Sequence, residues 1–261
     1  MTNLKHTFVI CAYKESEYLE TCIQSLLNQT IKTNIIISTA TPNDLIKGLA
    51  NKYKISLYIN EGEKGITQDW NFAYNHVQTP YVTIAHQDDF YEPHYIQKLI
   101  SAMEKSNDSI IGFTDYYEIR NNNKVNTNKI LKVKRILNTG FQISKRSRFV
   151  RNRILSIGNS ICCPAVTFNK LNCGKFQFNN DFKVSCDWDA WSRLAKKRGS
   201  YVYSRQKLMG HRIYEESTTT AMIEEGLRYK EDEEIYRRYW PKFIVKLLMS
   251  QYKKSMDSNK L

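Results

Sequence analysis

Short apolar runs alternate with longer amphipathic segments through the first 115 residues of the chain. The runs are β-prone and cover residues 7–12, 35–37, 55–59, 81–85 and 109–114. Between them apolar residues recur every three or four positions, as at Leu19, Cys22 and Leu26, which is typical of helices with one buried face. This alternation predicts a Rossmann-like α/β fold, with a mostly parallel central sheet and helices on both of its faces.

The run from Tyr81 to Ala85 ends abruptly in a polar cluster, His86-Gln87-Asp88-Asp89. In open α/β sheets, ligands bind at the C-terminal ends of the strands. Two adjacent carboxylates at such a place need a compensating cation, and a divalent metal ion provides it best. The cluster is therefore the first candidate site. An Asp-containing surface turn is the alternative interpretation.

The character of the chain changes after Glu118. No acidic residue occurs from Ile119 to Asn180, whereas thirteen residues of this segment are Lys or Arg. The segment opens with three asparagines, and we expect a long irregular excursion. Surfaces usually mix charges of both signs, so we interpret the segment as a face for phosphate groups. A solvated basic surface is the alternative.

A second acidic cluster opens a predicted helix near residue 187. Asp187 and Asp189 stand there close to Trp188 and Trp191. The dipole of a helix stabilises acidic residues in its first turn, which offers a purely structural explanation for both aspartates. Further on, residues 224–238 predict a charged helix, and residues 243–248 form an apolar patch with lysines around it. That patch predicts either an amphipathic helix on a membrane or a helix packed on the domain.

Composition narrows the class of protein. The net charge of +13 over 261 residues favours an anionic partner: nucleic acid, a membrane surface or a phosphorylated substrate. The six cysteines lack Cys-x-x-Cys spacing, which indicates free thiols in a reducing compartment. No signal peptide is evident, and no apolar run approaches the ~20 residues that span a bilayer. We expect a cytoplasmic protein, at the inner face of the membrane if it is peripheral.

Five segments, taken in order, resemble the motifs of the family-2 inverting glycosyltransferases, which have the A-type nucleotide-sugar transferase fold. The segments are residues 10–15, 64–71, 86–89, 158–168 and 186–194, and the likeness extends over residues 5 to 220.

This resemblance implies roles for particular residues. It places the donor against Ala12, Tyr13, Glu15, Thr39, Asp69, Gln87 and Asp88. Asp88 stands at the metal position of the family's Asp-X-Asp motif, where its hard oxygen suits Mn²⁺ or Mg²⁺, and Asp89 is the alternative ligand. Asp187 matches the family's catalytic base, with Trp188 and Asp189 on the acceptor side.

Some positions depart from the family. His86 replaces the first Asp of Asp-X-Asp, and Cys186 replaces the Glu of the Glu-Asp motif. Ser38-Thr39 stands where the family has an Asp pair that holds uridine. A later family His aligns with Tyr214, and His211 lies three residues before it. We assign His211 to the metal site, with Tyr214 as the alternative.

We expect residues 1–118 to bind the nucleotide-sugar, residues 119–221 to bind the acceptor, and residues 222–261 to form a helical tail that associates with the membrane. The expected activity is a metal-dependent, inverting hexosyl transfer in bacterial surface polysaccharide synthesis. The donor would be a UDP-sugar, and the acceptor a saccharide or a polyprenyl-diphosphate-linked glycan at an anionic membrane.

Two other functions compete with this one. The first is a catalytically weakened nucleotide-binding or scaffold protein of the same fold, motivated by the lost acids at residues 38, 39, 86 and 186. The second is a nucleic-acid-binding protein, motivated by the charge. We expect no nucleic-acid partner, because the basic segment lacks the regular aromatic interleaving that stacks bases.

Overall fold

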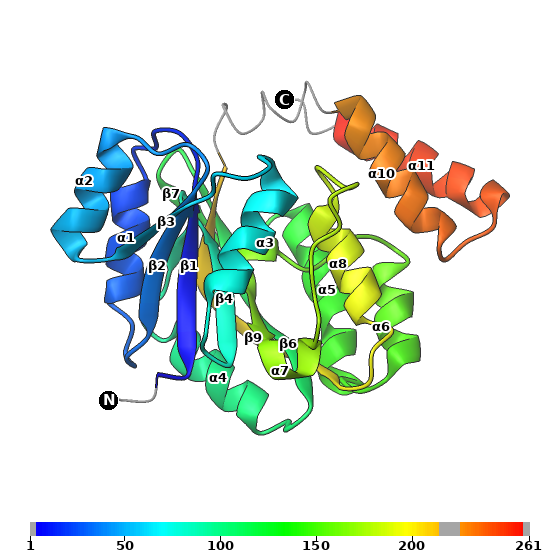
Figure 1. The fold of residues 1–261 in the computed structure, drawn as a ribbon. Helices are drawn as coiled ribbons and strands as arrows, with labels where there is room; N and C mark the ends of the chain where they lie inside the picture. The colour runs from blue at the N-terminus through cyan, green and yellow to red at the C-terminus, as the bar shows by residue number, and fades with distance from the viewer. Residues whose placement is uncertain (1–3, 214–224, 258–261) are drawn as a thin grey trace.

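Nine strands join in one sheet within residues 4–213 and 225–257, the parts of the chain that this computed structural model describes (Figure 1). Their order is β3 (Ser56–Ile59), β2 (Asn34–Thr39), β1 (His6–Ala12), β4 (Tyr81–His86), β8 (Val166–Asn169), β6 (Ser109–Arg120), β9 (Ser200–Ile213) and β5 (Phe90–Tyr91), and β7 (Asn123–Val125) pairs with β6. Strands β3, β2, β1 and β4 are parallel, β8 is antiparallel to β4 and β6, and β9 is parallel to β6. The predicted α/β class is confirmed.

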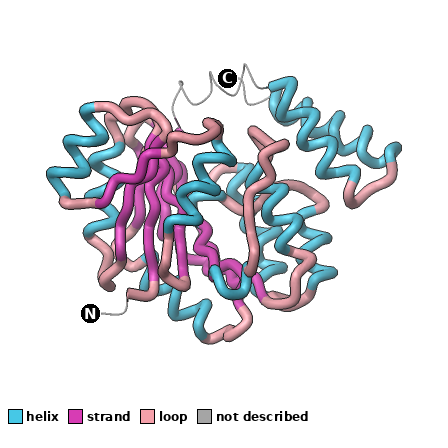
Figure 2. The backbone as a smooth tube through the Cα atoms, in the orientation of Figure 1, coloured by secondary structure: helices cyan, strands magenta, loops and turns pink. Residues whose placement is uncertain are grey.

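Helices cover both faces of the sheet (Figure 2). One face packs against α1 (Leu19–Leu27), α2 (Asp44–Tyr53) and α4 (Tyr95–Glu104), and the other against α3 (Ile66–His76), α6 (Arg148–Leu155) and α8 (Cys186–Leu194). Successive residues of a strand point to opposite faces. Accordingly Phe8 and Ile10 belong to the first apolar core, and Val9 belongs to the second. This burial on both sides explains why the strands are continuous apolar runs in the sequence.

The order of the strands creates a crevice between β1 and β4. From β1 the chain moves outward through β2 and β3, and it then returns to β4 on the other side of β1. Ala12 pairs with Thr39 on β2, and Cys11 pairs with His86 on β4. The C-terminal ends of these three strands therefore lie at one level, at the kind of switch point where α/β sheets bind ligands.

The prediction of a long irregular segment after Glu118 is wrong. Within the described residues this segment holds β7, α5 (Lys129–Ile143), α6, the short η1 (Cys163–Ala165), β8 and α7 (Lys170–Cys173). Helix α5 buries Leu131, Asn138 and Phe141 and exposes most of its lysines. Its N-terminus is capped by Asn128, whose Oδ1 accepts the N–H of Leu131 at 2.8 Å. The sequence did not predict this helix, because its few buried positions are spaced among many charged residues of the exposed face.

The last two helices, α10 (Glu225–Arg237) and α11 (Lys242–Asp257), pack on the domain beside α8 (Figure 1). Tyr236 on α10 and Val245 on α11 are buried in the same core as α8. The other side of α11 leaves Phe243 and Leu247 exposed. Of the two interpretations of this apolar patch, packing on the domain is therefore confirmed for one side of the helix. None of the helices described is long and apolar enough to cross a membrane.

Candidate active site

A cavity of about 680 Å³ opens at the C-terminal end of β4. Its walls come from elements distant in sequence, namely α3, β4, β6, α5, the segment 158–164, the segment that leads into α8 with the start of α8, β9 and α10. The polar side chains of its lining include His86, Lys134, Asn159, Asp187, His211 and Arg228. The volume falls within the range of about 300–1,000 Å³ that is usual for small-molecule sites.

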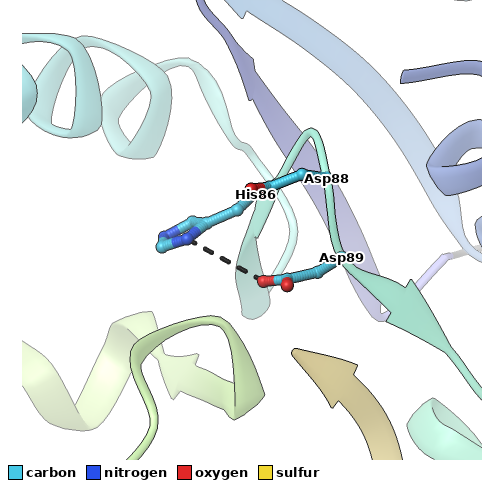
Figure 3. A group of neighbouring side chains, drawn as sticks. All are labelled: His86, Asp88 and Asp89. Atoms are coloured by element: carbon cyan, nitrogen blue, oxygen red, sulfur yellow. Dashed lines mark ion pairs between the residues drawn. The ribbon is translucent and has the colours of Figure 1, made fainter. Parts of the chain in front are cut away.

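Three potential metal ligands gather where β4 turns toward β5. One ligand atom each from His86, Asp88 and Asp89 lies within 4.8 Å of the others. Figure 3 shows the imidazole of His86 facing the carboxylate of Asp89, and His86 Nδ1 lies 3.9 Å from Asp89 Oδ2. His86 Nε2 and Asp89 Oδ2 are buried, and neither has a hydrogen-bond partner in the part of the chain that the structure describes. Such atoms are costly to leave unpaired, so the cluster fits a divalent cation.

His211 on β9 joins this cluster through Asp89. Its Nδ1 lies 3.0 Å from Asp89 Oδ1, which also accepts the N–H of Arg212 at 3.0 Å. A carboxylate on one ring nitrogen fixes the tautomer of an imidazole and leaves the other nitrogen for a metal. Burial lowers the pKa of His211, but the charge of Asp89 and its hydrogen bond, with the charge of Asp88, raise that pKa above its ordinary value overall.

The electrostatics of Asp88 also favour a cation. Burial raises the pKa of Asp88, and the neighbouring negative charge of Asp89 raises it further. The backbone carbonyl of Asp88 accepts a hydrogen bond from Arg212 Nε at 3.0 Å, which fixes this turn. The structure thus places the predicted ligand Asp88 in the cluster and the predicted ligand His211 beside it, in contact with Asp89. It adds His86, which sequence reasoning treated only as a departure from the family. Tyr214, the alternative to His211, lies outside the described residues.

The residues expected on the donor side surround the ends of β1 and β2. The side-chain amide of Gln87 makes two hydrogen bonds with the backbone of Tyr13. Gln87 Oε1 accepts the Tyr13 N–H, and Gln87 Nε2 donates to the Tyr13 carbonyl, each at 2.9 Å. Thr39 is buried, and its Oγ1 accepts the N–H of Thr41 at 3.0 Å. Gln87 and Thr39 therefore shape the loops after β1 and β2, while Glu15 is exposed beyond them.

Asp69 reaches the same region from the first turn of α3. Its Oδ1 accepts a hydrogen bond from Asn60 Nδ2 at 2.7 Å, and burial raises its pKa. The next residue, Trp70, lines the cavity and stacks on His86 with the ring centroids 5.5 Å apart. This stack could not be predicted from the sequence, because the two residues lie on different elements.

Asp187 lines the cavity from the first turn of α8. Its Oδ2 accepts a hydrogen bond from Asn159 Nδ2 at 2.7 Å, and its Oδ1 accepts the N–H of Trp188 at 2.7 Å. Burial raises the pKa of Asp187, and these two hydrogen bonds with the charges of Lys134 and Arg228 only partly oppose the rise. A carboxylate with a raised pKa on a cavity wall can accept a proton.

The two neighbours of Asp187 in the motif have different surroundings. Trp188 lines the cavity, and its Nε1 donates to the carbonyl of Leu155 at 3.0 Å. Asp189 is fully buried between Arg193 Nε and Arg238 Nη1, each at 2.7 Å from one of its oxygens. Asp189 is not part of the cavity wall. The expected contact between Asp189 and an acceptor therefore has no geometric support, because two arginines already occupy its carboxylate.

The fold and the cavity together define a protein with the architecture of the A-type nucleotide-sugar transferases. Residues 7–171 match the model of glycosyl transferase family 2, and the chain therefore belongs to this family. The resemblance seen in the sequence is confirmed. Asp187 and helix α10 lie beyond the matched residues.

Two curated relatives share part of this sequence. An uncharacterized glycosyltransferase of Haemophilus influenzae is 22% identical over 230 residues, which is 81% of this chain and 66% of that protein. Glycosyltransferase GlyA of Streptococcus pneumoniae is 28% identical over 100 residues, which is 36% of this chain and 14% of that protein. The chain thus spans less than two thirds of the length of either relative.

Solved structures resemble the fold more broadly. Residues 1–349 of TarS from S. aureus superpose with a TM-score of 0.67 at 12% identity, covering 98% of this chain and 73% of that one. The same TarS fragment with UDP-GlcNAc gives 0.61 at 14% identity, with coverages of 81% and 59%. The mannosyltransferase PcManGT from Pyrobaculum calidifontis, with GDP-Man and Mn²⁺, gives 0.64 at 10% identity, with coverages of 95% and 68%. At such identities the likeness concerns the fold alone.

Proposed function

We propose that the protein is an inverting glycosyltransferase that moves a sugar from a nucleotide-sugar to an acceptor hydroxyl. The observation that carries this proposal is a single cavity lined both by Asp187 and by His86 and His211, the two histidines at the metal cluster. The cluster of His86, Asp88 and Asp89 with His211 lies at the sheet edge, and Asp187 lies on the α8 wall. Membership of glycosyl transferase family 2 supports the same reaction class.

The donor would bind at the ends of β1, β2 and β4. Asp88, His86 and His211 are the proposed ligands of Mn²⁺ or Mg²⁺, and Asp89 orients His211 through its 3.0 Å contact. A bound cation would neutralise the charge that develops on the leaving nucleoside diphosphate. The neighbouring structures with UDP-GlcNAc and with GDP-Man and Mn²⁺ support a nucleotide-sugar donor of this kind. We propose a UDP-sugar.

Asp187 is the proposed general base. Its carboxylate would take the proton of the acceptor hydroxyl while the acceptor oxygen bonds to the anomeric carbon and the bond from that carbon to the diphosphate breaks. The electrons of the broken bond remain on the diphosphate oxygen. Asn159 holds one oxygen of Asp187 and so limits the orientations of the carboxylate. A single displacement needs no nucleophilic side chain and inverts the anomeric configuration.

The acceptor is proposed to be a saccharide or a lipid-linked glycan at an anionic membrane, and the enzyme to act at its cytoplasmic face. The outer side of α5 supports this assignment. Val133 and Ile136 are 56% and 73% exposed there, beside the exposed Lys129 and Lys132, and the acid-free segment continues around them. Apolar and basic residues on one exposed helix face suit an anionic bilayer. Six free cysteines fit a reducing compartment.

The reaction can be tested without knowing the acceptor. The protein would be incubated with a panel of UDP- and GDP-sugars and Mn²⁺, with and without a chelator, and release of the nucleoside diphosphate measured. We expect slow release that requires the metal and one class of donor. Glu104→Gln changes an exposed carboxylate that pairs with Lys5 just before β1, at the end of the sheet opposite to the site, and should leave the rate unchanged. Donor binding without any release, even with acceptor mixtures present, would favour the scaffold alternative.

A further inference from the structure

Helix α10 forms part of the cavity wall, although sequence reasoning assigned it to a separate tail. Arg228, Asp232 and Tyr236 recur every four residues on α10, and all three line the cavity. Residues with this spacing lie on one face of a helix. From α5, Ile130 and Lys134 line the same cavity with the same spacing. Two helices distant in sequence therefore each present a cation to the space in front of Asp187.

The position of α10 is fixed by contacts with the segment before α8. Glu231 accepts three backbone N–H groups, from Lys183 at 2.8 Å, Val184 at 2.9 Å and Ser185 at 2.7 Å. Consecutive N–H groups of this kind form a nest for an anion, which the Glu231 carboxylate fills. The segment 183–185 leads directly into α8 and Asp187. Arg228 thus lies on a helix that is hydrogen-bonded to the segment preceding Asp187, the candidate base.

The second cation, Lys134, lies between the two carboxylate sites. Its Nζ donates to Tyr116 Oη at 3.2 Å, and the ring of Tyr116 lies 6.3 Å from that of His211, centroid to centroid. Burial raises the pKa of Asp187, and the positive charges of Lys134 and Arg228 both oppose this rise. Both cations are therefore close enough to act on the carboxylate of Asp187.

Neither cation is neutralised by an ion pair within residues 4–213 and 225–257. Asp232, the acidic side chain of the same wall, accepts a hydrogen bond from Ser185 Oγ at 2.5 Å. Much of the remaining lining is apolar, including Ile66, Ile161 and Val184. Cations in a partly desolvated, apolar cavity are costly unless an anion joins them. The ligand itself can provide that anion.

We propose that Lys134 and Arg228 form an anion subsite that binds a phosphate or carboxylate of the acceptor, beside the hydroxyl that Asp187 deprotonates. This inference rests on the proposed function, because it assumes that the acceptor enters by the Asp187 wall. The diphosphate of the donor has its own partner in the metal cluster at the end of β4. The acceptor is then an acidic sugar or a sugar phosphate, and neutral sugars bind poorly.

The test uses the full chain with UDP and Mn²⁺ at saturating concentration, so that the donor side is occupied. Glycerol 1-phosphate, glucuronate and glucose are then titrated separately by calorimetry. We expect one or both of the anions to bind and glucose to bind at least about tenfold more weakly. Arg228→Gln and Lys134→Gln should each weaken anion binding by about tenfold or more, the usual effect of losing one charge-assisted hydrogen bond.

Arg237→Gln is the matched control on α10. Arg237 is exposed and pairs with Glu233 on its own helix, so its loss should change anion affinity less than twofold. Melting temperatures close to that of the unmodified protein would show that all variants fold. The affinity for UDP with Mn²⁺, measured separately, tests the proposed donor site. Equal affinity for anions and glucose, unchanged anion affinity in both variants, or a loss of UDP affinity in place of anion affinity would each overturn the anion subsite.

Discussion

Asp187→Asn is the sharpest test of the catalytic assignment. The carboxylate accepts one hydrogen bond from Asn159 and one from the N–H of Trp188. An asparagine keeps the shape and one acceptor oxygen, so the structural loss is one hydrogen bond, about 1 kcal/mol. The side chain also loses its charge, which burial disfavours at this position. The variant should therefore fold and bind the donor, but its side chain cannot accept a proton.

The expected effect on the reaction is much larger. A positioned general base contributes about 10²- to 10⁴-fold, which corresponds to about 2.7–5.4 kcal/mol of activation free energy. The pH profile carries a second signature. Because burial raises the pKa of Asp187 above its ordinary value of 3.8, the rate for the unmodified protein should rise with pH as this carboxyl loses its proton. Asp187→Asn should lack that acidic limb.

The assay is sugar transfer at saturating donor, with kcat and the donor affinity measured separately from pH 4 to 8. Asp189→Asn is an unsuitable control, because unpairing Arg193 and Arg238 would cost about 3–5 kcal/mol of stability. Asp181→Asn is better, since Asp181 is exposed and only six residues earlier. Transfer by Asp187→Asn within about tenfold of the unmodified rate, or an unchanged acidic limb, would refute the assignment.

Three further outcomes are expected. Asp88→Ala should abolish the Mn²⁺-dependent part of donor binding in calorimetry, and a donor affinity that the substitution leaves unchanged, both with and without metal, would remove Asp88 from the site. His6 is buried against Thr33 and Thr83, and burial lowers its pKa to about 3. In the unfolded chain the imidazole of His6 binds a proton near pH 6.5, whereas in the folded protein it stays neutral there. The free energy of unfolding therefore decreases as the pH falls below 6.5. The loss is about 2 kcal/mol at pH 5. Urea unfolding of the unmodified protein and of His6→Gln should show it, and parallel pH dependence of the two proteins would contradict it. Ile136→Glu, on the exposed side of α5, should reduce flotation with anionic vesicles, and negligible binding of the unmodified protein to such vesicles would argue against the membrane assignment.

The fold was predictable because its strands are buried on both faces. Runs such as Ile35 to Ile37 are apolar at every position. Continuous apolar strands of this kind are typical of a parallel sheet that is covered on both faces. The basic segment was not predictable in the same way. In α5 only Leu131, Asn138 and Phe141 are buried, so the helical spacing is sparse among charged residues.

The candidate site likewise has a part that the sequence predicts and a part that it does not. The positions of Asp88 and Asp187 followed from local motifs, each with its strand end or helix start. The partners that give these residues their properties are distant in sequence. His211 contacts Asp89 across 122 residues, and Arg238 contacts Asp189 across 49. No local spacing encodes such contacts, so the pairing of Asp189 with Arg238 could not be anticipated, whereas its pairing with Arg193, four residues later on α8, follows helical spacing.

The nest filled by Glu231 bears on the order in which the two sides of the proposed site are completed during synthesis. A chain leaving the ribosome folds its N-terminal part first. The strands of the donor crevice are present once residue 86 has emerged, and the proposed metal ligand His211 completes that side, but the support of Asp187 waits for Glu231, which follows His211 in the chain. A nascent chain would therefore complete the proposed donor side before the support of the proposed base. Catalytic competence would arrive late in synthesis, which limits wasteful breakdown of the donor by incomplete chains.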